Sequence, residues 1–230
     1  MMTRDPSSDP ALDRGRSPAA RASRTRLIVI EGMPGAGKTT IATGLTARGH
    51  RVLGEYTAPS AATLPVAGHP PVAADDAHQA NWLRKSRQAA RALSEQTGPV
   101  FADRDWLSSL AYAYSIADTD DGLLLIQRAA WAAAHLSAGD LMPGNFYMVL
   151  HASVPVSLRR RRGHLRAGHP WSHPPSLRRL QAFYRHPVQI LNRHAPQVAQ
   201  HLGDVRWIHL PPLSTLDDAL LAACTLGATP

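Results

Sequence analysis

A transition from an apolar strand to a glycine-rich loop constrains this chain more than any other feature. The run at residues 27–31 leads directly into residues 32–39, which match the pattern G-x-x-x-x-G-K-T. Glycines let such a loop curl so that successive backbone N–H groups point inward and hold a phosphate. Residues 40–45 then have the pattern of an amphipathic helix, whose amino-terminal dipole also favours an anion. The sequence therefore predicts a phosphate-binding loop between a strand and a helix.

Each position of this loop has an expected role. Lys38 supplies a point charge to the outer phosphates, and Thr39 offers a hydroxyl group to Mg²⁺. A glycine-rich turn that precedes a lysine by chance is the alternative, and the flanking strand and helix argue against it. The predicted nucleotide-binding positions are Gly32, Met33, Pro34, Gly35, Ala36, Gly37, Lys38, Thr39 and Thr40.

The length and the cysteine content indicate an ordinary intracellular domain. A chain of 230 residues can bury a core without covalent cross-links. Its only cysteine, Cys224, excludes a disulfide framework and suits a reducing cytoplasm, where we expect the protein. No apolar run approaches the roughly 20 residues that a bilayer requires. We expect residues 1–25 to form a disordered tail and residues 26–230 to form one domain.

The net charge of +8 raises the question of nucleic-acid binding. Much of that charge lies in the tail, where residues 1–26 hold six arginines and three aspartates, and in the single run 159–162. Aromatic residues are not interleaved with the basic ones, as a stacking surface for single strands would require. We therefore expect no nucleic-acid partner and no membrane association.

Strands and helices alternate along the chain, which favours a parallel sheet covered by helices. A helix that begins near Val156 is basic, and another that begins at Leu177 is expected to be interrupted or kinked at Pro187. We expect strands at 27–31, 51–55, 100–102, 146–151 and 205–210, and further helices at 38–47, 75–96, 105–117, 121–138 and 215–226.

Asp103 follows the buried strand at 100–102, and Arg104 comes next. Because the carboxyl ends of parallel strands meet at one edge of a sheet, Asp103 is expected to face the phosphate-binding loop, where Mg²⁺ needs a second anchor. Arg104 could then hold the transferring phosphoryl group. The alternative is that Asp103 caps the helix near Asp105 while Arg104 lies on the surface.

The loop, the strand-end acid and the run Asp103-Arg104-Asp105-Trp106-Leu107-Ser108-Ser109-Leu110-Ala111-Tyr112 together resemble the P-loop kinases of nucleosides and nucleotides, particularly thymidylate kinases. The resemblance spans about residues 27–225. It implies a three-layer α/β/α fold with a central parallel sheet of about five strands. It also implies that Asp103 and Arg104 lie near the acceptor and the reacting phosphates. Helices that border the acceptor pocket in this family would carry Trp82, Trp106, Tyr112 and Tyr114.

The arginine run follows the strand at 146–151, where the resemblance places a mobile basic lid. Arginine forks stabilise the negative charge that develops on phosphoryl oxygens, so one or two of these residues are expected in the site. We select Arg159 and Arg162 for that role. A solvated basic helix is the alternative.

The departures from the thymidylate kinase pattern concern the acceptor. Those enzymes carry an Arg-Glu-Pro triplet after the second strand, and its arginine grips the acceptor's phosphate. Here the segment begins Gly54-Glu55-Tyr56, so the arginine is a glycine and the carboxylate remains. Related deoxynucleoside kinases place such a carboxylate against the hydroxyl group that they phosphorylate, as a general base. The loss of the phosphate-binding arginine and the retention of Glu55 as a base predict an acceptor with a neutral hydroxyl group. The alternative is that Glu55 is an acidic residue of a surface loop.

The sequence thus predicts a kinase that uses ATP or GTP with Mg²⁺, in which Lys38, Glu55, Asp103, Arg104, Arg159 and Arg162 act in catalysis and Thr39 and Asp103 hold the metal. The acceptor is a nucleoside or an antibiotic inactivated by phosphorylation, since P-loop antibiotic phosphotransferases such as the chloramphenicol enzymes are also similar. A thymidylate or other nucleoside monophosphate kinase is one alternative. A nucleotide-binding regulator with little turnover is another. The assembly state is left open between a monomer and a homodimer.

Overall fold

A computed structural model of the chain describes residues 26–71, 74–117, 122–162, 169–212 and 214–225. In these described residues, parallel strands form a five-stranded sheet in the order β2-β3-β1-β4-β5, which confirms the predicted sheet. The tail predicted at residues 1–25 lies outside the described part. The strands are β1 (Leu27–Gly32), β2 (Arg51–Leu53), β3 (Val100–Asp103), β4 (Phe146–Leu150) and β5 (Arg206–Leu210).

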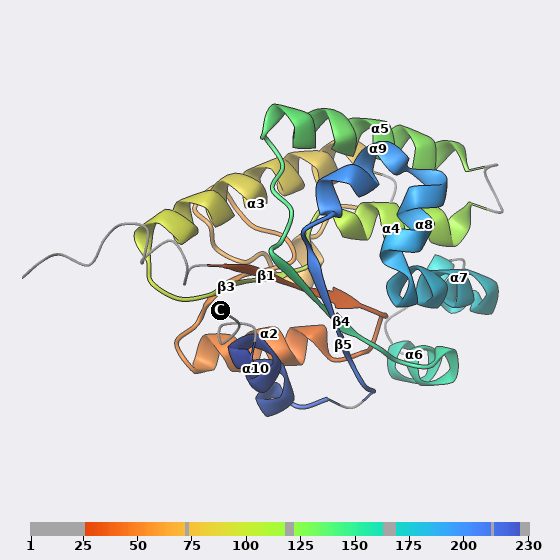
Figure 1. Cartoon of the computed structure of the whole chain (residues 1–230). Helices are drawn as coiled ribbons and strands as arrows, with labels where there is room; N and C mark the ends of the chain where they lie inside the picture. Colours follow the sequence, from red (N-terminus) through yellow and green to blue (C-terminus); the bar gives the residue numbers. More distant parts are fainter. Residues whose placement is uncertain (1–25, 72–73, 118–121, 163–168, 213, 226–230) are drawn as a thin grey trace, which may run out of the picture.

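Helices cover both faces of this sheet (Figure 1). Helices α2 and α10 pack together on one side, and α3, α4 and α5 lie on the other. No helix in the described ranges is long and apolar enough to cross a membrane. The helices are α2 (Lys38–Ala47), α3 (Asp75–Glu95), α4 (Leu107–Ile116), α5 (Leu123–Ala138), α6 (Val154–Arg161), α7 (Pro174–Arg185), α8 (Pro187–His194), α9 (Pro196–Ala199) and α10 (Leu216–Thr225), with 3₁₀ turns η1 (Val66–Gly68), η2 (Pro170–Ser172) and η3 (Gln200–Leu202).

The central strand β1 places the site. All six of its residues are buried, as expected of an apolar strand covered by helices on both faces. In its register with β3, Ile30 pairs with Asp103, and in its register with β4, Gly32 pairs with Leu150. The carboxyl ends of β1, β3 and β4 therefore meet at the edge where the phosphate loop begins.

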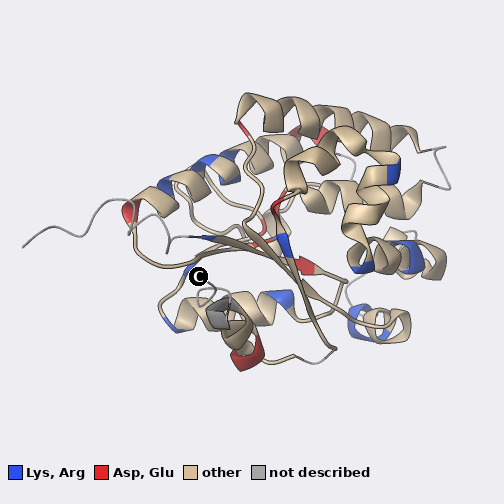
Figure 2. Ribbon diagram, in the orientation of Figure 1, with Lys and Arg blue, Asp and Glu red and all other residues tan. Residues whose placement is uncertain are grey.

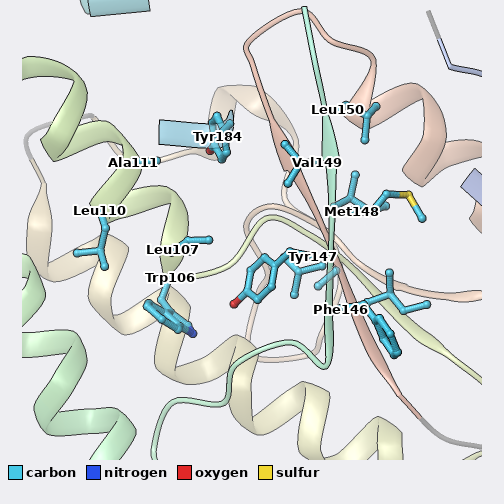
Figure 3. Close-up of a cluster of buried hydrophobic side chains, with 14 of the residues drawn as sticks. Trp106, Leu107, Leu110, Ala111, Phe146, Tyr147, Met148, Val149, Leu150 and Tyr184 are labelled. Carbon is cyan, nitrogen blue, oxygen red and sulfur yellow. The ribbon is translucent and has the colours of Figure 1, made fainter. Parts of the chain in front are cut away.

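The hydrophobic core between the sheet and α4 holds this edge rigid (Figure 3). Trp106 is 1 % exposed and belongs to the same buried cluster as residues of α4, β4 and α7, including Tyr184. Each large buried side chain of this kind contributes about 2–3 kcal/mol through burial. The acceptor side of the sheet is thus supported by aromatic packing rather than by loops alone.

One predicted boundary differs from the structure, and one predicted helix break agrees with it. Strand β2 ends at Leu53 and not at residue 55, because the chain turns there and Thr57 forms an antiparallel bridge with Thr63. Pro187 begins the separate helix α8 after His186, which is consistent with the predicted interruption. Proline suits the first turn of a helix because its missing N–H would lack an intrahelical partner there.

Gly32 is the backbone position with the least tolerance for a side chain. Its φ is +131°, and a Cβ atom there would lie 2.1 Å from the carbonyl oxygen of Leu150. We expect Gly32→Ala to lower the free energy of unfolding by about 2–4 kcal/mol through strain and backbone overlap. Gly37→Ala is the matched control, because Gly37 also has a positive φ but has open space around it. If urea denaturation shows the same loss of unfolding free energy in both variants, overlap with Leu150 does not explain the loss in Gly32→Ala.

Candidate active site

The phosphate loop has an inward-facing lysine. Lys38 lies at the start of α2, is 6 % exposed, and its Nζ donates hydrogen bonds to the carbonyl oxygens of Gly32 (2.9 Å) and Met33 (2.8 Å). Burial, with Arg104 nearby, lowers the pKa of Lys38 to about 7. Thr39 and Thr40 are exposed and line a cavity of about 810 Å³ together with Lys38. We call this space the phosphate-loop cavity.

Helix α6 is fastened to the phosphate loop. Ser157 donates a hydrogen bond to the carbonyl oxygen of Pro34 (2.7 Å), and Arg160 donates one to the carbonyl oxygen of Gly35 (2.8 Å). Of the arginine run, Arg160 and Arg161 line the phosphate-loop cavity. The two that we selected, Arg159 and Arg162, are exposed and are not among its lining residues. Figure 2 shows the basic positions of α6 beside those of α7.

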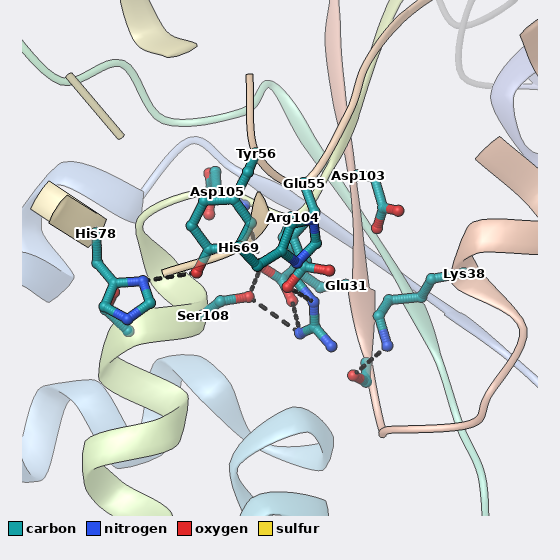
Figure 4. Close-up of polar contacts among 12 residues, drawn as sticks. Glu31, Lys38, Glu55, Tyr56, His69, His78, Asp103, Arg104, Asp105 and Ser108 are labelled. Carbon is teal, nitrogen blue, oxygen red and sulfur yellow. Dashed lines mark hydrogen bonds and ion pairs between the residues drawn. The ribbon is translucent and has the colours of Figure 1, made fainter. Parts of the chain in front are cut away.

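Asp103 lies at the end of β3, on the same side of Arg104 as Lys38 (Figure 4). It is 5 % exposed, and its Oδ1 atom is buried with no hydrogen-bond partner in the described part of the chain. Burial, with negative Glu55 nearby, raises the pKa of Asp103 above its usual value. A buried carboxylate oxygen without a hydrogen-bond partner is the kind of oxygen donor that Mg²⁺ binds.

An ion pair links the ends of β2 and β3. The Nε atom of Arg104 lies 3.0 Å from Oε1 of Glu55, and the Arg104 Nη1 lies 3.6 Å from the buried Glu31. Burial opposes the charge of Glu55, but Arg104 and then Lys38 bring the pKa of Glu55 below its usual value. Arg104 also has a φ of +63°, a strained conformation outside glycine. The structure thus brings three predicted residues, Lys38, Glu55 and Arg104, to one cavity.

Sequence reasoning missed the buried acid that supports this group. Glu31 is fully buried and accepts hydrogen bonds from the hydroxyl groups of Ser108 (2.6 Å) and Tyr184 (2.8 Å). Burial beside Glu31 raises the pKa of Asp105 to about 7. A glutamate inside an apolar strand, directly before the phosphate loop, was the available signal, because buried charges require partners.

Helix α3 carries a second group that the sequence did not reveal. Asn81, 1 % exposed, donates to the carbonyl oxygen of Glu55 (3.1 Å) and accepts from the backbone N–H of Thr57 (3.1 Å). One turn later, Lys85 donates to the carbonyl oxygens of Asp103 and Arg104, each at 2.6 Å. One face of α3 therefore fixes the backbone on both sides of the Glu55–Arg104 ion pair.

Asn81 is accordingly a positioning residue, and its loss has a specific expected effect. We expect Asn81→Ala to lower kcat by about 10- to 100-fold, because the backbone that carries Glu55 would shift. The affinity for nucleotide should stay within about twofold, since Asn81 does not line the phosphate-loop cavity. Asn192→Ala, at an exposed asparagine of α8, is the control. A fall in nucleotide affinity equal to the fall in kcat would contradict this role.

A second, smaller cavity of about 140 Å³ adjoins the ion pair and shares Glu55 and Arg104 with the phosphate-loop cavity. We call it the ring-lined cavity, because its wall includes Tyr56, His78, Trp82, Tyr112 and Trp171. Of the four aromatic residues that we expected to border the acceptor pocket, two line this cavity, Trp82 and Tyr112. Trp106 and Tyr114 do not line it; Trp106 is a core residue, and Tyr114 packs on Arg179 and Phe183.

Comparisons with known proteins agree with this architecture. A family model described as an AAA domain matches residues 27–136, just under half of the chain. Among solved structures, deoxyadenosine kinase from M. mycoides with dCMP and a flexible dCDP bound is similar at 16% identity, and two further structures of it, with dATP and with dCTP, at 15%. Each comparison covers 88% of this chain and 100% of that chain, with a TM-score of 0.57. A search among curated proteins gave no significant match. The chain therefore has the P-loop kinase fold, as its resemblance to the nucleoside and nucleotide kinases implies.

Proposed function

We propose that this chain is a small-molecule kinase that transfers the γ-phosphate of ATP or GTP to a hydroxyl group of a neutral acceptor. The observation that carries the proposal is the Glu55–Arg104 ion pair of 3.0 Å, which stands between the phosphate-loop cavity and the ring-lined cavity. A carboxylate and a guanidinium at that junction are suited to an incoming hydroxyl and a migrating phosphoryl group respectively.

The proposed reaction divides the work among these residues. Glu55 accepts the proton of the acceptor hydroxyl as its oxygen forms a bond to the γ-phosphorus, and the bond from that phosphorus to the bridging oxygen breaks to release the nucleoside diphosphate. Lys38, Arg104 and the α6 arginines Arg160 and Arg161 would balance the charge on the phosphoryl oxygens. Thr39, and Asp103 through water, would hold Mg²⁺, which supplies charge neutralisation between the phosphates.

The backbone around Gly54 supports a neutral acceptor. A Cβ atom at Gly54 would lie 2.2 Å from Cγ2 and 2.8 Å from Cβ of Thr63, so an arginine does not fit at the position where thymidylate kinases grip a phosphate. Glu55 is also the kind of base that a hydroxyl acceptor requires and that an ionised phosphate does not. A nucleoside and an antibiotic with a free hydroxyl group are the acceptor classes that we propose. A cytoplasmic location is a further expectation, and sedimentation would decide between a monomer and a homodimer.

Radiolabel transfer from [γ-³²P]ATP and [γ-³²P]GTP tests the proposal. The acceptor panel contains nucleosides, nucleoside monophosphates and hydroxyl-bearing antibiotics such as chloramphenicol, each with and without Mg²⁺. We expect label on neutral acceptors only. Label on thymidine monophosphate alone would establish a monophosphate kinase instead. Tight nucleotide binding without transfer to any acceptor would establish a nucleotide-binding regulator.

A further inference from the structure

The ring-lined cavity has a definite capacity. Its volume is about 140 Å³, and an engineered apolar protein cavity of about 150 Å³ binds one benzene molecule. Pockets that enclose drug-sized ligands usually measure about 300–1,000 Å³. The space within its own wall therefore suits a single six-membered ring, and the rest of a larger acceptor would extend into the phosphate-loop cavity, whose lining also includes Tyr56, His78 and Trp171.

The rings of the wall form two edges of this space. Tyr112 of α4 and Trp171 of η2 meet edge to face, with centroids 5.3 Å apart. Tyr56, in the loop after β2, and Trp82 of α3 form the second edge, with ring centroids 5.7 Å apart and an interplanar angle of 35°. Aromatic walls of this kind favour a flat guest through stacking and edge contacts.

Several polar groups of the wall have hydrogen-bond partners within the protein. The Trp82 indole donates to Ser109 Oγ (2.8 Å), and His78 uses Nδ1 with the Tyr56 hydroxyl (2.6 Å) and Nε2 with the carbonyl oxygen of Pro71 (3.0 Å). The hydroxyl of Ser108 donates to Glu31.

The remaining cation of the wall is also committed. Arg128 is held by both carboxylate oxygens of Asp75 and by the carbonyl oxygen of Ser109, while its guanidinium lies 5.2 Å from the centre of the Tyr112 ring. An acceptor whose ring carries hydrogen-bonding edges would have to break these contacts and would lose the solvation of its own polar groups. Of the charged residues in the wall, Glu55 and Arg104 are the two that also line the phosphate-loop cavity.

We infer that the acceptor is an uncharged alcohol that carries one flat apolar ring close to its hydroxyl group, with the ring in the ring-lined cavity and the hydroxyl at Glu55. This inference rests on the proposed function. It assigns the ring-lined cavity to selection by shape and apolar contact, and it narrows the two proposed acceptor classes to molecules whose ring lacks hydrogen-bonding edges.

The test compares three acceptors with one nucleotide donor. 2-Phenylethanol presents a single apolar ring, thymidine presents a ring with hydrogen-bonding edges, and 2′-deoxyadenosine presents a purine. We expect kcat/KM for 2-phenylethanol to exceed that for each nucleoside by at least about tenfold, as a site that leaves polar edges unpaired discriminates strongly. A nucleoside that equals or exceeds 2-phenylethanol overturns the inference and leaves the proposed kinase activity intact.

A matched pair of variants on α4 tests the cavity itself through binding. Tyr112→Ala should raise the Kd of 2-phenylethanol at least about fivefold by removing a wall, Tyr112→Phe should keep it within twofold, and Tyr114→Ala should leave it unchanged because Tyr114 lies outside the cavity. Nucleotide binding reports that each variant is folded. Equal affinity in all three variants, or no binding of 2-phenylethanol by the wild type, overturns the inference. Because binding is measured without turnover, failure of phosphoryl transfer alone would count against the proposed function and not against the ring site.

Discussion

Glu55→Gln is expected to lower kcat by about 10²- to 10⁴-fold while nucleotide affinity changes little, because a general base acts on proton transfer and not on donor binding. Glutamine keeps the size of the side chain and removes its basicity. Although burial opposes its charge, Arg104 and then Lys38 bring the pKa of Glu55 below its usual value, so the wild-type base is ionised at neutral pH. Its contribution to kcat/KM should be lost only as the pH falls through that lowered value.

Glu95→Gln provides the control, because Glu95 is exposed and pairs only with Arg91 in an i,i+4 contact on α3. Thermal unfolding of Glu55→Gln must also be measured, because the substitution removes one acidic partner of Arg104 and leaves Glu31 as the other. A loss of less than about tenfold, combined with thymidine monophosphate as the preferred acceptor, would favour a monophosphate kinase. Arg104 would then be the residue that grips the acceptor's phosphate.

Lys38→Ala should reduce phosphoryl transfer by about 10²- to 10³-fold or more, because the charge matters most when negative charge develops on the transferring group. Single-turnover transfer from labelled ATP measures this loss directly. The substitution also removes two hydrogen bonds to the carbonyl oxygens of the loop. Lys38→Met fills the same space without the charge and separates the two effects.

If Lys38→Met is as inactive as Lys38→Ala and its melting temperature stays close to that of the wild type, the loss of activity is due to the missing charge. Retention of more than about a tenth of the wild-type rate in either variant would contradict a catalytic role for the loop, given the several kcal/mol expected from such a group. Arg48→Ala, at an exposed residue after α2, serves as the charge-removal control.

The predictable part of the site consists of residues and elements that follow one another in the sequence. The strand, the loop and α2 follow one another in the chain, and Asp103 and Arg104 follow the buried strand β3, so local sequence placed them. Contacts between distant segments were not predictable in this way. Tyr184 reaches Glu31 across 153 positions of the chain, and nothing near either residue in the sequence records that pairing. Asn81 likewise reaches Glu55 and Thr57 through their backbone atoms, which leaves no side-chain signature at either partner.

The choice among the four arginines shows a different limit. Side chains three and four positions apart share one face of a helix, so the docking of Ser157 on Pro34 turns Arg160 and Arg161 toward the phosphate loop. Arg159 and Arg162 then point elsewhere. Composition and periodicity could place a basic helix here, but its rotation depends on tertiary hydrogen bonds to the phosphate loop.

The close approach of Gly54 and Thr63 also bears on how the acceptor preference of this chain could change. Thr63 is held opposite by its bridge to Thr57, and its own Cβ lies 2.8 Å from where a side chain at position 54 would begin. An arginine at position 54 therefore requires Thr63 to move or to be shortened to glycine. Under the proposed function, a preference for monophosphates would thus depend on residue 63 as well as on residue 54.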